Sequence, residues 1–139
     1  KRKIRVIMTK PVFNKIDCYS IPVADLDKGI QFYNNLGHKL LWRDGTHSAG
    51  LSLPGSDDEL VLHTDNRPFE TCLLVDSVDT AVDSIVKNGG TLVFGPIQIK
   101  VGKYALLNDP WKNPLPILDF SNGLLLTDSD GNVIGNQPK

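Results

Sequence analysis

One segment of the chain is repeated at a constant offset of 52 residues, and this repeat limits the folds that the chain can adopt. The stretch IPVADLDKGIQFYNNLGHKLLW, residues 21–42, aligns without a gap with LLVDSVDTAVDSIVKNGGTLVF, residues 73–94. Few aligned positions are identical, but apolar residues, helix-capping residues and glycines coincide along the stretch. A repeat of this kind indicates two copies of one supersecondary unit. We therefore expect two modules, at residues 13–65 and 69–120.

Each module is predicted to contain a strand, a helix and then three further strands. Asp25 and Ser77 precede apolar residues at helical spacing, and their side-chain oxygens can cap a helix N-terminus. A glycine follows each apolar pattern, which is typical of a helix end. The helices are expected near residues 25–36 and 77–88. The expected strands are 18–23, 38–43, 48–53 and 59–64 in the first module, and 70–75, 91–95, 103–108 and 114–120 in the second.

The composition sets bounds on the class of protein. The 139 residues are 40% hydrophobic and 22% charged, as is ordinary for a globular protein with one core. A net charge of −1 gives no reason to expect a nucleic-acid partner. No apolar run approaches the roughly 18 residues of a membrane span, and the start KRKIRVIM lacks the features of a secretion signal. We expect a cytoplasmic protein without a nucleic-acid or membrane partner.

The repeat and its flanks also give the expected domain bounds. A single domain is expected over residues 9–123, preceded at 1–8 by a possible tag or an extended start. After the second module, residues 124–139 read LLLTDSDGNVIGNQPK, with an Asp-Gly turn between two apolar segments. Such a pattern is typical of a hairpin, so a C-terminal hairpin or arm is expected there.

With its repeat, its opening motif KIDCYSIPVADLDKGIQFYNNLG and its closing motif LLNDPWKNPLPILDF, the chain resembles the vicinal oxygen chelate superfamily. That superfamily includes glyoxalase I, the bleomycin and fosfomycin resistance proteins and the extradiol dioxygenases. The resemblance runs from about Phe13 to Phe120. It implies an α+β fold in which two βαβββ modules form a curved, eight-stranded open barrel around a cavity. Because one fold hosts several reactions, the resemblance indicates the fold more firmly than the chemistry.

The resemblance also implies where metal ligands would lie, on the first and last strand of each module. These positions hold Cys18, His63, Glu70 and Pro116 in this chain. Pro116 takes the place of a metal-binding carboxylate, and Cys18 takes the place of a histidine. Cys18, His63 and Glu70 therefore remain as weak candidates for a divalent metal site, with Zn, Ni, Fe or Mn as the ion. The incomplete ligand set favours a site without a cofactor.

Strand alternation predicts which side chains face the cavity, because residues i and i+2 of a strand share one face. The expected cavity residues are Cys18, Ser20, Trp42, His63, Glu70, Cys72, Tyr104 and Pro116. We expect the four former ligand positions to converge on one centre. A buried Glu70 needs a partner, and His63 is the expected one. The sequence identifies no catalytic residue.

Two functions from different classes remain open. The first is a protein of the glyoxalase and bleomycin-resistance type that binds a small organic molecule in its cavity without a complete metal site. The second is a metal-dependent enzyme with an altered ligand set, either a glyoxalase I-like lyase or a dioxygenase-like enzyme. A homodimer is expected in both cases, because open sheets leave apolar faces and edges that a second copy can cover.

Overall fold

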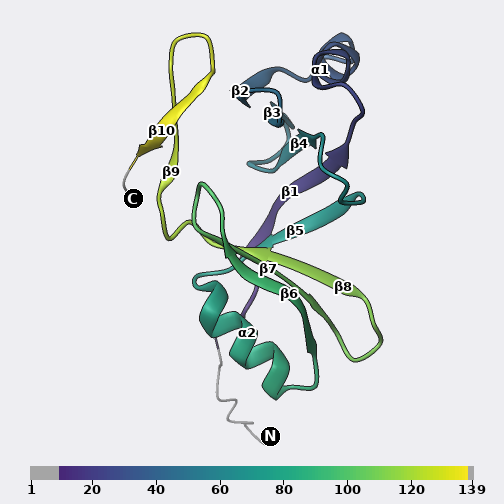
Figure 1. Ribbon diagram of the computed structural model, residues 1–139, viewed down its shortest axis with the longest axis vertical. Coiled ribbons are helices and arrows are strands. Elements are labelled where there is room, and N and C mark those ends of the chain that lie inside the picture. Colours follow the sequence, from purple (N-terminus) through teal and green to yellow (C-terminus); the bar gives the residue numbers. More distant parts are fainter. Residues whose placement is uncertain (1–9, 138–139) are drawn as a thin grey trace, which may run out of the picture.

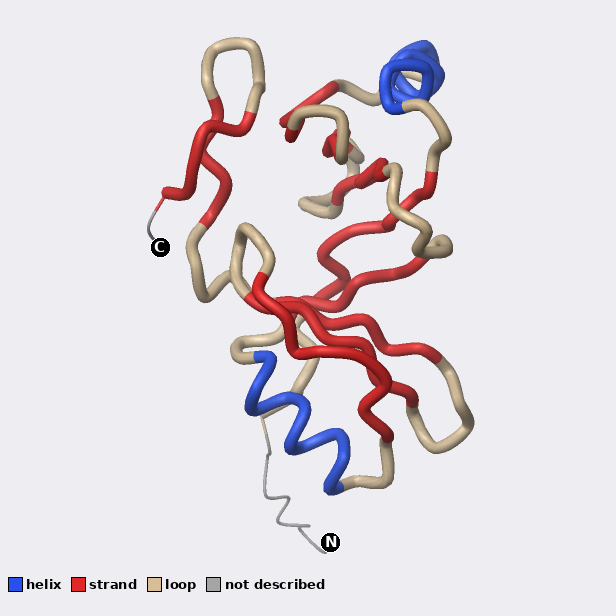
Figure 2. Tube along the Cα trace, in the orientation of Figure 1, coloured by secondary structure: helices blue, strands red, loops and turns tan. Residues whose placement is uncertain are grey.

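The computed structural model describes residues 10–137 of the chain, so the possible tag or extended start at 1–8 lies outside the described residues (Figure 1). The elements follow the predicted order of two βαβββ modules, with a further strand pair at the end (Figure 2). Their bounds are β1 Lys15–Pro22, α1 Leu26–Asn35, β2 Leu40–Asp44, β3 Ser48–Ser52, β4 Glu59–His63, β5 Glu70–Leu74, α2 Val78–Lys87, β6 Thr91–Gln98, β7 Lys103–Asn108, β8 Pro114–Leu118, β9 Leu124–Thr127 and β10 Val133–Gln137.

Both helices begin and end where the local sequence signals predict. The Asp25 carboxylate accepts a hydrogen bond from the Lys28 backbone N–H at 3.0 Å, and α1 begins at the next residue. Ser77 caps α2 in the same way, through the Thr80 N–H. Gly37 lies just beyond α1 with φ of +99°, a left-handed conformation that glycine adopts without strain. No helix among residues 10–137 is long and apolar enough to cross a membrane.

The eight strands of the two modules form one curved sheet, which is not closed into a barrel. Their order is β2-β3-β4-β1-β5-β8-β7-β6. At the centre β1 and β5 pair antiparallel, and each also pairs parallel with the last strand of its own module, β4 or β8. The two modules are therefore joined through their first strands within a single chain (Figure 1).

Each helix packs on its own module and produces its own hydrophobic core. The buried residues of the first core are Leu26, Ile30, Ala49, Leu51 and Leu62, and those of the second are Val75, Val78, Ala81, Ala105, Leu107 and Ile117. Leu62 of β4 and Ile117 of β8 therefore face the helix side of the sheet. A third, smaller cluster contains Cys18, Cys72 and Leu118 and lies where the modules meet. The sheet thus has one face covered by helices and another that is free to line pockets.

The C-terminal residues form a two-stranded antiparallel hairpin of β9 and β10. Near its turn, the Gly131 carbonyl accepts a hydrogen bond from the Arg43 N–H of β2 at 2.8 Å. Near its open end, the Asn136 side-chain amide donates to the Lys100 carbonyl, in the β6–β7 loop, at 2.8 Å. The hairpin therefore reaches from the first module to the second along one side of the molecule (Figure 1).

Candidate functional site

Two adjoining pockets lie on the sheet face that the helices leave uncovered. The larger, here called the central pocket, has a volume of about 770 Å³, and the smaller, here called the proline pocket, about 610 Å³. Arg67, Phe94 and Tyr104 line both pockets. Strands of both modules form the walls of the central pocket, together with the β6–β7 loop and with Leu124 and Leu125 of the hairpin.

Cys18 and Cys72 lie at the junction of the modules and line the central pocket. They are cross-strand partners in the β1–β5 ladder, both thiols are free, and they are 5% and 2% exposed. The interaction between the two thiols, together with burial, raises the pKa of Cys18, and the same interaction lowers the pKa of Cys72. Ser20, two residues further along β1, is also buried and lines the same pocket.

Asp17 reaches the central pocket because of a β-bulge. The β1–β5 register shifts between Ile16 and Cys18, which leaves Asp17 without a partner in that ladder. A bulge of this kind breaks the strict alternation of side chains between the two faces. Asp17 and Cys18 therefore both line the pocket although they are consecutive residues. Burial raises the pKa of the Asp17 carboxyl above its ordinary value.

Trp42 and Glu59 form a second polar contact on the pocket wall. The Trp42 indole Nε1–H donates to Glu59 Oε1 at 2.8 Å. The indole lies directly against Gly50 of β3, where any Cβ would overlap it. Burial raises the pKa of Glu59, the hydrogen bond from Trp42 opposes that shift, and the negative charge of Asp17 adds to it. Asp17 and Glu59 thus give this wall a partly buried acidic character.

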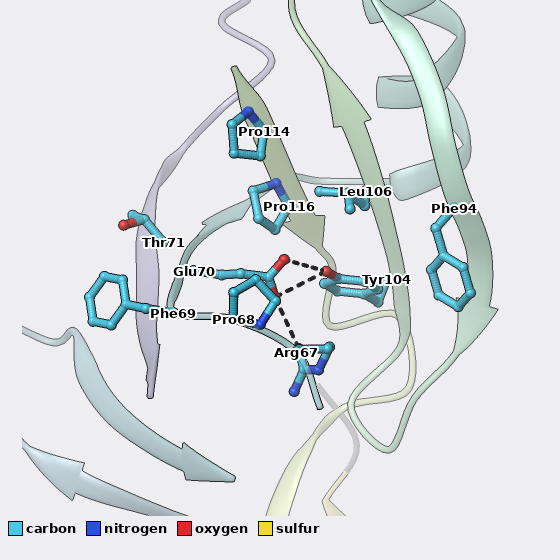
Figure 3. A pocket seen from close by; sticks show the side chains of 10 residues that line it. All are labelled: Arg67, Pro68, Phe69, Glu70, Thr71, Phe94, Tyr104, Leu106, Pro114 and Pro116. Atoms are coloured by element: carbon cyan, nitrogen blue, oxygen red, sulfur yellow. Dashed lines mark hydrogen bonds and ion pairs between the residues drawn. The ribbon is translucent and has the colours of Figure 1, made fainter. Parts of the chain in front are cut away.

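Glu70 lies in the proline pocket with partners that differ from the predicted one (Figure 3). Tyr104 Oη donates to its carboxylate, at 3.3 Å from Oε1 and 3.2 Å from Oε2, and Arg67 Nη1 forms an ion pair with Oε1 at 3.3 Å. The guanidinium group also lies 5.8 Å from the centre of the Tyr104 ring. Burial and the charge of Glu70 raise the pKa of Tyr104, so its hydroxyl stays protonated and donates.

The expected pairing of His63 with Glu70 is therefore wrong. His63 is 1% exposed, and neither of its ring nitrogens has a hydrogen-bond partner in the described part of the chain. Burial, with a smaller contribution from the positive charge of Arg67, lowers its pKa. His63 ends β4, and it lines neither pocket.

The four former ligand positions do not share one centre. Cys18 lines the central pocket, whereas Glu70 and Pro116 line the proline pocket. Two strands, β1 and β5, lie between the strands of His63 and Pro116, which corresponds to roughly 14 Å at the usual strand spacing. Within residues 10–137, no three His, Cys, Asp or Glu side chains form a group that could hold a metal ion.

The direction of backbone hydrogen bonds explains how β8 accommodates two prolines. Asp119, just after β8, donates its N–H to the Lys103 carbonyl in line with β7 at 3.1 Å. Because neighbouring residues of a strand turn their backbone groups to opposite sides, odd-numbered residues of β8 face β7 and even-numbered residues face β5. Pro114 and Pro116 therefore have their missing N–H groups on the β5 side.

The proline pocket lies where these missing donors leave β5 and β8 unpaired. The two strands pair only at Leu73–Ile117 and Leu74–Leu118, beyond both prolines. Pro114 and Pro116 of β8 line this pocket together with Glu70 of β5 (Figure 3). Pro116 thus keeps the two strands apart, because it offers β5 no N–H, and it gives Glu70 a partly apolar surrounding.

Comparisons with known proteins agree on the fold. A model of the Glyoxalase/Bleomycin resistance protein/Dioxygenase superfamily matches residues 15–134. An uncharacterized protein from Mycolicibacterium smegmatis is 33% identical over 100 residues, which cover 68% of this chain and 84% of that protein. The superfamily model covers most of both modules and much of the hairpin.

Two solved structures show the same fold at low sequence identity. Methylmalonyl-CoA epimerase from Mycobacterium tuberculosis matches with a TM-score of 0.62 and 19% identity, over 81% of this chain and 92% of that chain. Homoprotocatechuate 2,3-dioxygenase from Brevibacterium fuscum, as its E323L mutant, matches with a TM-score of 0.59 and 16% identity. The match covers 89% of this chain but 38% of the dioxygenase chain, so the likeness is to part of that enzyme.

Proposed function

The chain belongs to the Glyoxalase/Bleomycin resistance protein/Dioxygenase superfamily, and from this premise we propose that it binds a small organic molecule in the central pocket without a complete metal site. The observation that carries the proposal is the pocket itself. Its volume of about 770 Å³ lies within the roughly 300–1,000 Å³ of known small-molecule sites. Its lining is mainly apolar with a few polar groups, which is the usual composition of such sites.

The scattered donors support the metal-free part of the proposal. Cys18 and Glu70 line different pockets, and His63 lines neither. The carboxylate of Glu70 is occupied by Tyr104 and Arg67, so a metal ion would have to displace a hydrogen bond and an ion pair. The neighbouring Cys72 thiol and burial raise the pKa of Cys18, so Cys18 stays a neutral thiol at ordinary pH, and only the thiolate binds metal well.

The test uses the tryptophan that lines the pocket. The chain has two tryptophans, so Trp42 is the one that remains in a Trp111→Phe variant. Trp111 is 79% exposed in the β7–β8 turn, so we expect its replacement to leave the fold unchanged. We expect the neutral fluorophore N-phenyl-1-naphthylamine to bind saturably and to quench Trp42 by energy transfer. A Val61→Phe variant, which fills the pocket from β4, should weaken binding at least about tenfold. Circular dichroism checks that it folds. The proposal is wrong if the fluorophore shows no saturable binding.

The metal-dependent alternative has one observation in its favour. Glu70 stands at a ligand position implied by the family resemblance and is 8% exposed beside a pocket. Elemental analysis of protein purified without chelator tests this alternative. Stoichiometric Zn, Ni, Fe or Mn that is lost in Glu70→Gln and in Cys18→Ser would favour a lyase or dioxygenase-like enzyme over a metal-free binding protein.

A homodimer completes the proposal. The edge strand β6 carries four exposed apolar residues, Leu92, Val93, Phe94 and Ile97, and its outer edge pairs with no other strand among the described residues. An edge of this kind is a suitable surface for a second copy of the chain.

A further inference from the structure

We propose that the ligand of the central pocket carries a positive charge, and that Asp17 and Glu59 bind it. This inference rests on the proposed function, since it names the chemical class of the molecule that the pocket takes. A ligand of this class has an apolar or aromatic body and an ammonium or guanidinium group at one end.

The charges around the pocket point in this direction. Its lining includes four carboxylates, of Asp17, Asp44, Glu59 and Asp65, but only two basic side chains, Arg67 and Lys100. Both basic side chains already form ion pairs with carboxylates, either of the pocket lining or of Glu70 beside it. The ion pairs are Lys100–Asp44 at 3.7 Å, Arg67–Asp65 at 3.2 Å and Arg67–Glu70 at 3.3 Å. An anionic ligand would therefore find no cation that is not already paired.

Asp17 and Glu59, in contrast, have no ion-pair partner. No Lys, Arg or His nitrogen of residues 10–137 lies within 4.0 Å of either carboxylate. The hydrogen bond that Glu59 accepts comes from the Trp42 indole, which is neutral. A partly buried carboxylate without a cation is costly, because the protein replaces only part of the hydration that it has lost.

The two carboxylates also lie close to each other. Glu59 is the register partner of Cys18 in the β1–β4 ladder, and Asp17 precedes Cys18 at the bulge that turns it into the pocket. The negative charge of Asp17 raises the pKa of Glu59. A cation bound between them would remove this repulsion. Its N–H groups would donate charge-assisted hydrogen bonds to both carboxylates.

Apolar side chains supply the contacts for the rest of the ligand. Phe94, Ile97, Val101, Phe120 and Leu125 line the pocket from the second module, the β6–β7 loop and the hairpin. Trp42 lines it beside Glu59 and offers an aromatic ring to a cation as well. The pocket thus combines an acidic wall with a large apolar surface, which matches an amphiphilic cation.

Three naphthalene compounds that differ in one group test the inference. They are 1-naphthylmethylamine, 1-naphthalenemethanol and 1-naphthoate, and each competes with the neutral probe N-phenyl-1-naphthylamine for the wild-type protein. At pH 7 we expect the amine to bind about tenfold more tightly than the alcohol, and the carboxylate to bind most weakly. The preference for the amine should disappear in Asp17→Asn and in Glu59→Gln.

Matched controls separate the possible causes. Asp83→Asn removes the same charge from the exposed face of α2 and should retain the preference for the amine. Unchanged binding of the neutral probe shows that each pocket variant is folded. If the alcohol binds as tightly as the amine, or if the preference survives in both pocket variants, the inference is wrong while the proposed function stands. If the neutral probe itself does not bind to the wild type, the proposed function fails and takes this inference with it.

Discussion

Tyr104 and Glu70 show how a single hydroxyl supports a buried carboxylate. Tyr104 is 6% exposed and donates to both carboxylate oxygens, while Arg67 forms an ion pair with one of them. In Tyr104→Phe the carboxylate keeps only the half-exposed Arg67. We expect a loss of about 1–3 kcal/mol in the free energy of unfolding, because a buried charged group loses a hydrogen bond. Urea denaturation measures this loss.

A matched control is Tyr33→Phe in α1. The Tyr33 ring is partly buried against the first core, but its hydroxyl makes no hydrogen bond within the described residues. We expect this variant to change the free energy of unfolding by less than about 0.5 kcal/mol. Equal losses in both tyrosine variants would mean that the Tyr104–Glu70 bond contributes nothing specific.

The thiols of Cys18 and Cys72 give a second test at the residue scale. Both are buried at the module junction, and the interaction between them raises the pKa of Cys18 and lowers that of Cys72. Because burial keeps the reagent from both thiols, we expect the native protein at pH 8 to react with Ellman's reagent at least about tenfold more slowly than the unfolded protein. Occupation of the central pocket by N-phenyl-1-naphthylamine should slow the reaction further. Rapid modification of both thiols in native protein would contradict this picture.

Strand alternation assigns a face of the sheet to each expected site residue, but it gives no information on that residue's partners. Alternation placed Cys18, Ser20 and Cys72 on the uncovered face, because each lies in a regular part of its strand. Asp17 escaped it, since a bulge depends on how β1 pairs with β5 and has no local signal. Glu59 could have been found, because it lies two residues before Val61 in β4. The expected pairing of His63 with Glu70 is wrong for a related reason: alternation predicts which face of the sheet a side chain lies on, but not how far apart two strands lie in the sheet.

At the scale of the elements, one buried carboxylate connects α2 to two strands. Asp119 follows β8, is 2% exposed, and accepts hydrogen bonds from the Val78 N–H at 2.8 Å, the Lys103 N–H at 2.9 Å and the Ser121 hydroxyl at 2.7 Å. Burial alone would raise its pKa, but the hydrogen bonds outweigh burial and lower it below the ordinary value of 3.8. The ionised form therefore stabilises the folded state.

The sign of this shift gives a pH dependence. The stabilisation is complete at pH values above the unfolded-state pKa near 3.8 and is lost as the pH falls through the lower folded-state pKa. We expect Asp119→Asn to lower the free energy of unfolding by about 2 kcal/mol at pH 7, with a smaller difference from wild type at the lowest pH where both fold. Urea denaturation at several pH values checks this. A loss in Asp119→Asn that does not change with pH would show that the ionised form has no special role.

Caps, glycines and apolar periodicity predicted the elements well, because these signals act within a few residues of the chain. Asp25 and Ser77 cap the helices, and the strands lie close to their predicted bounds. The path of the β9–β10 hairpin could not be predicted in this way. It depends on contacts such as Arg43 with Gly131, which join segments far apart in the sequence.

At the scale of the whole molecule, pairing of β1 with β5 leaves β2 and β6 as the two edges of the sheet. The hairpin contacts β2 through the Arg43–Gly131 hydrogen bond and thereby protects part of that edge. On the outer side of β6, no strand of the described chain pairs, and Val93 at 51% exposed is among the apolar residues there. The two edges therefore differ, and β6 is the edge that needs a partner.

We expect the protein to sediment as a dimer at micromolar concentration, with β6 in the interface. Val93→Glu should shift it towards the monomer, because two-fold symmetry would bring the two introduced carboxylates onto the same apolar surface, where their burial and mutual repulsion oppose association. Val86→Glu is the matched control, since Val86 is similarly exposed, at 46%, but lies on α2. Sedimentation equilibrium distinguishes the cases. A monomeric wild type excludes the dimer, and dissociation by Val86→Glu but not by Val93→Glu would move the interface from the sheet edge to the helix.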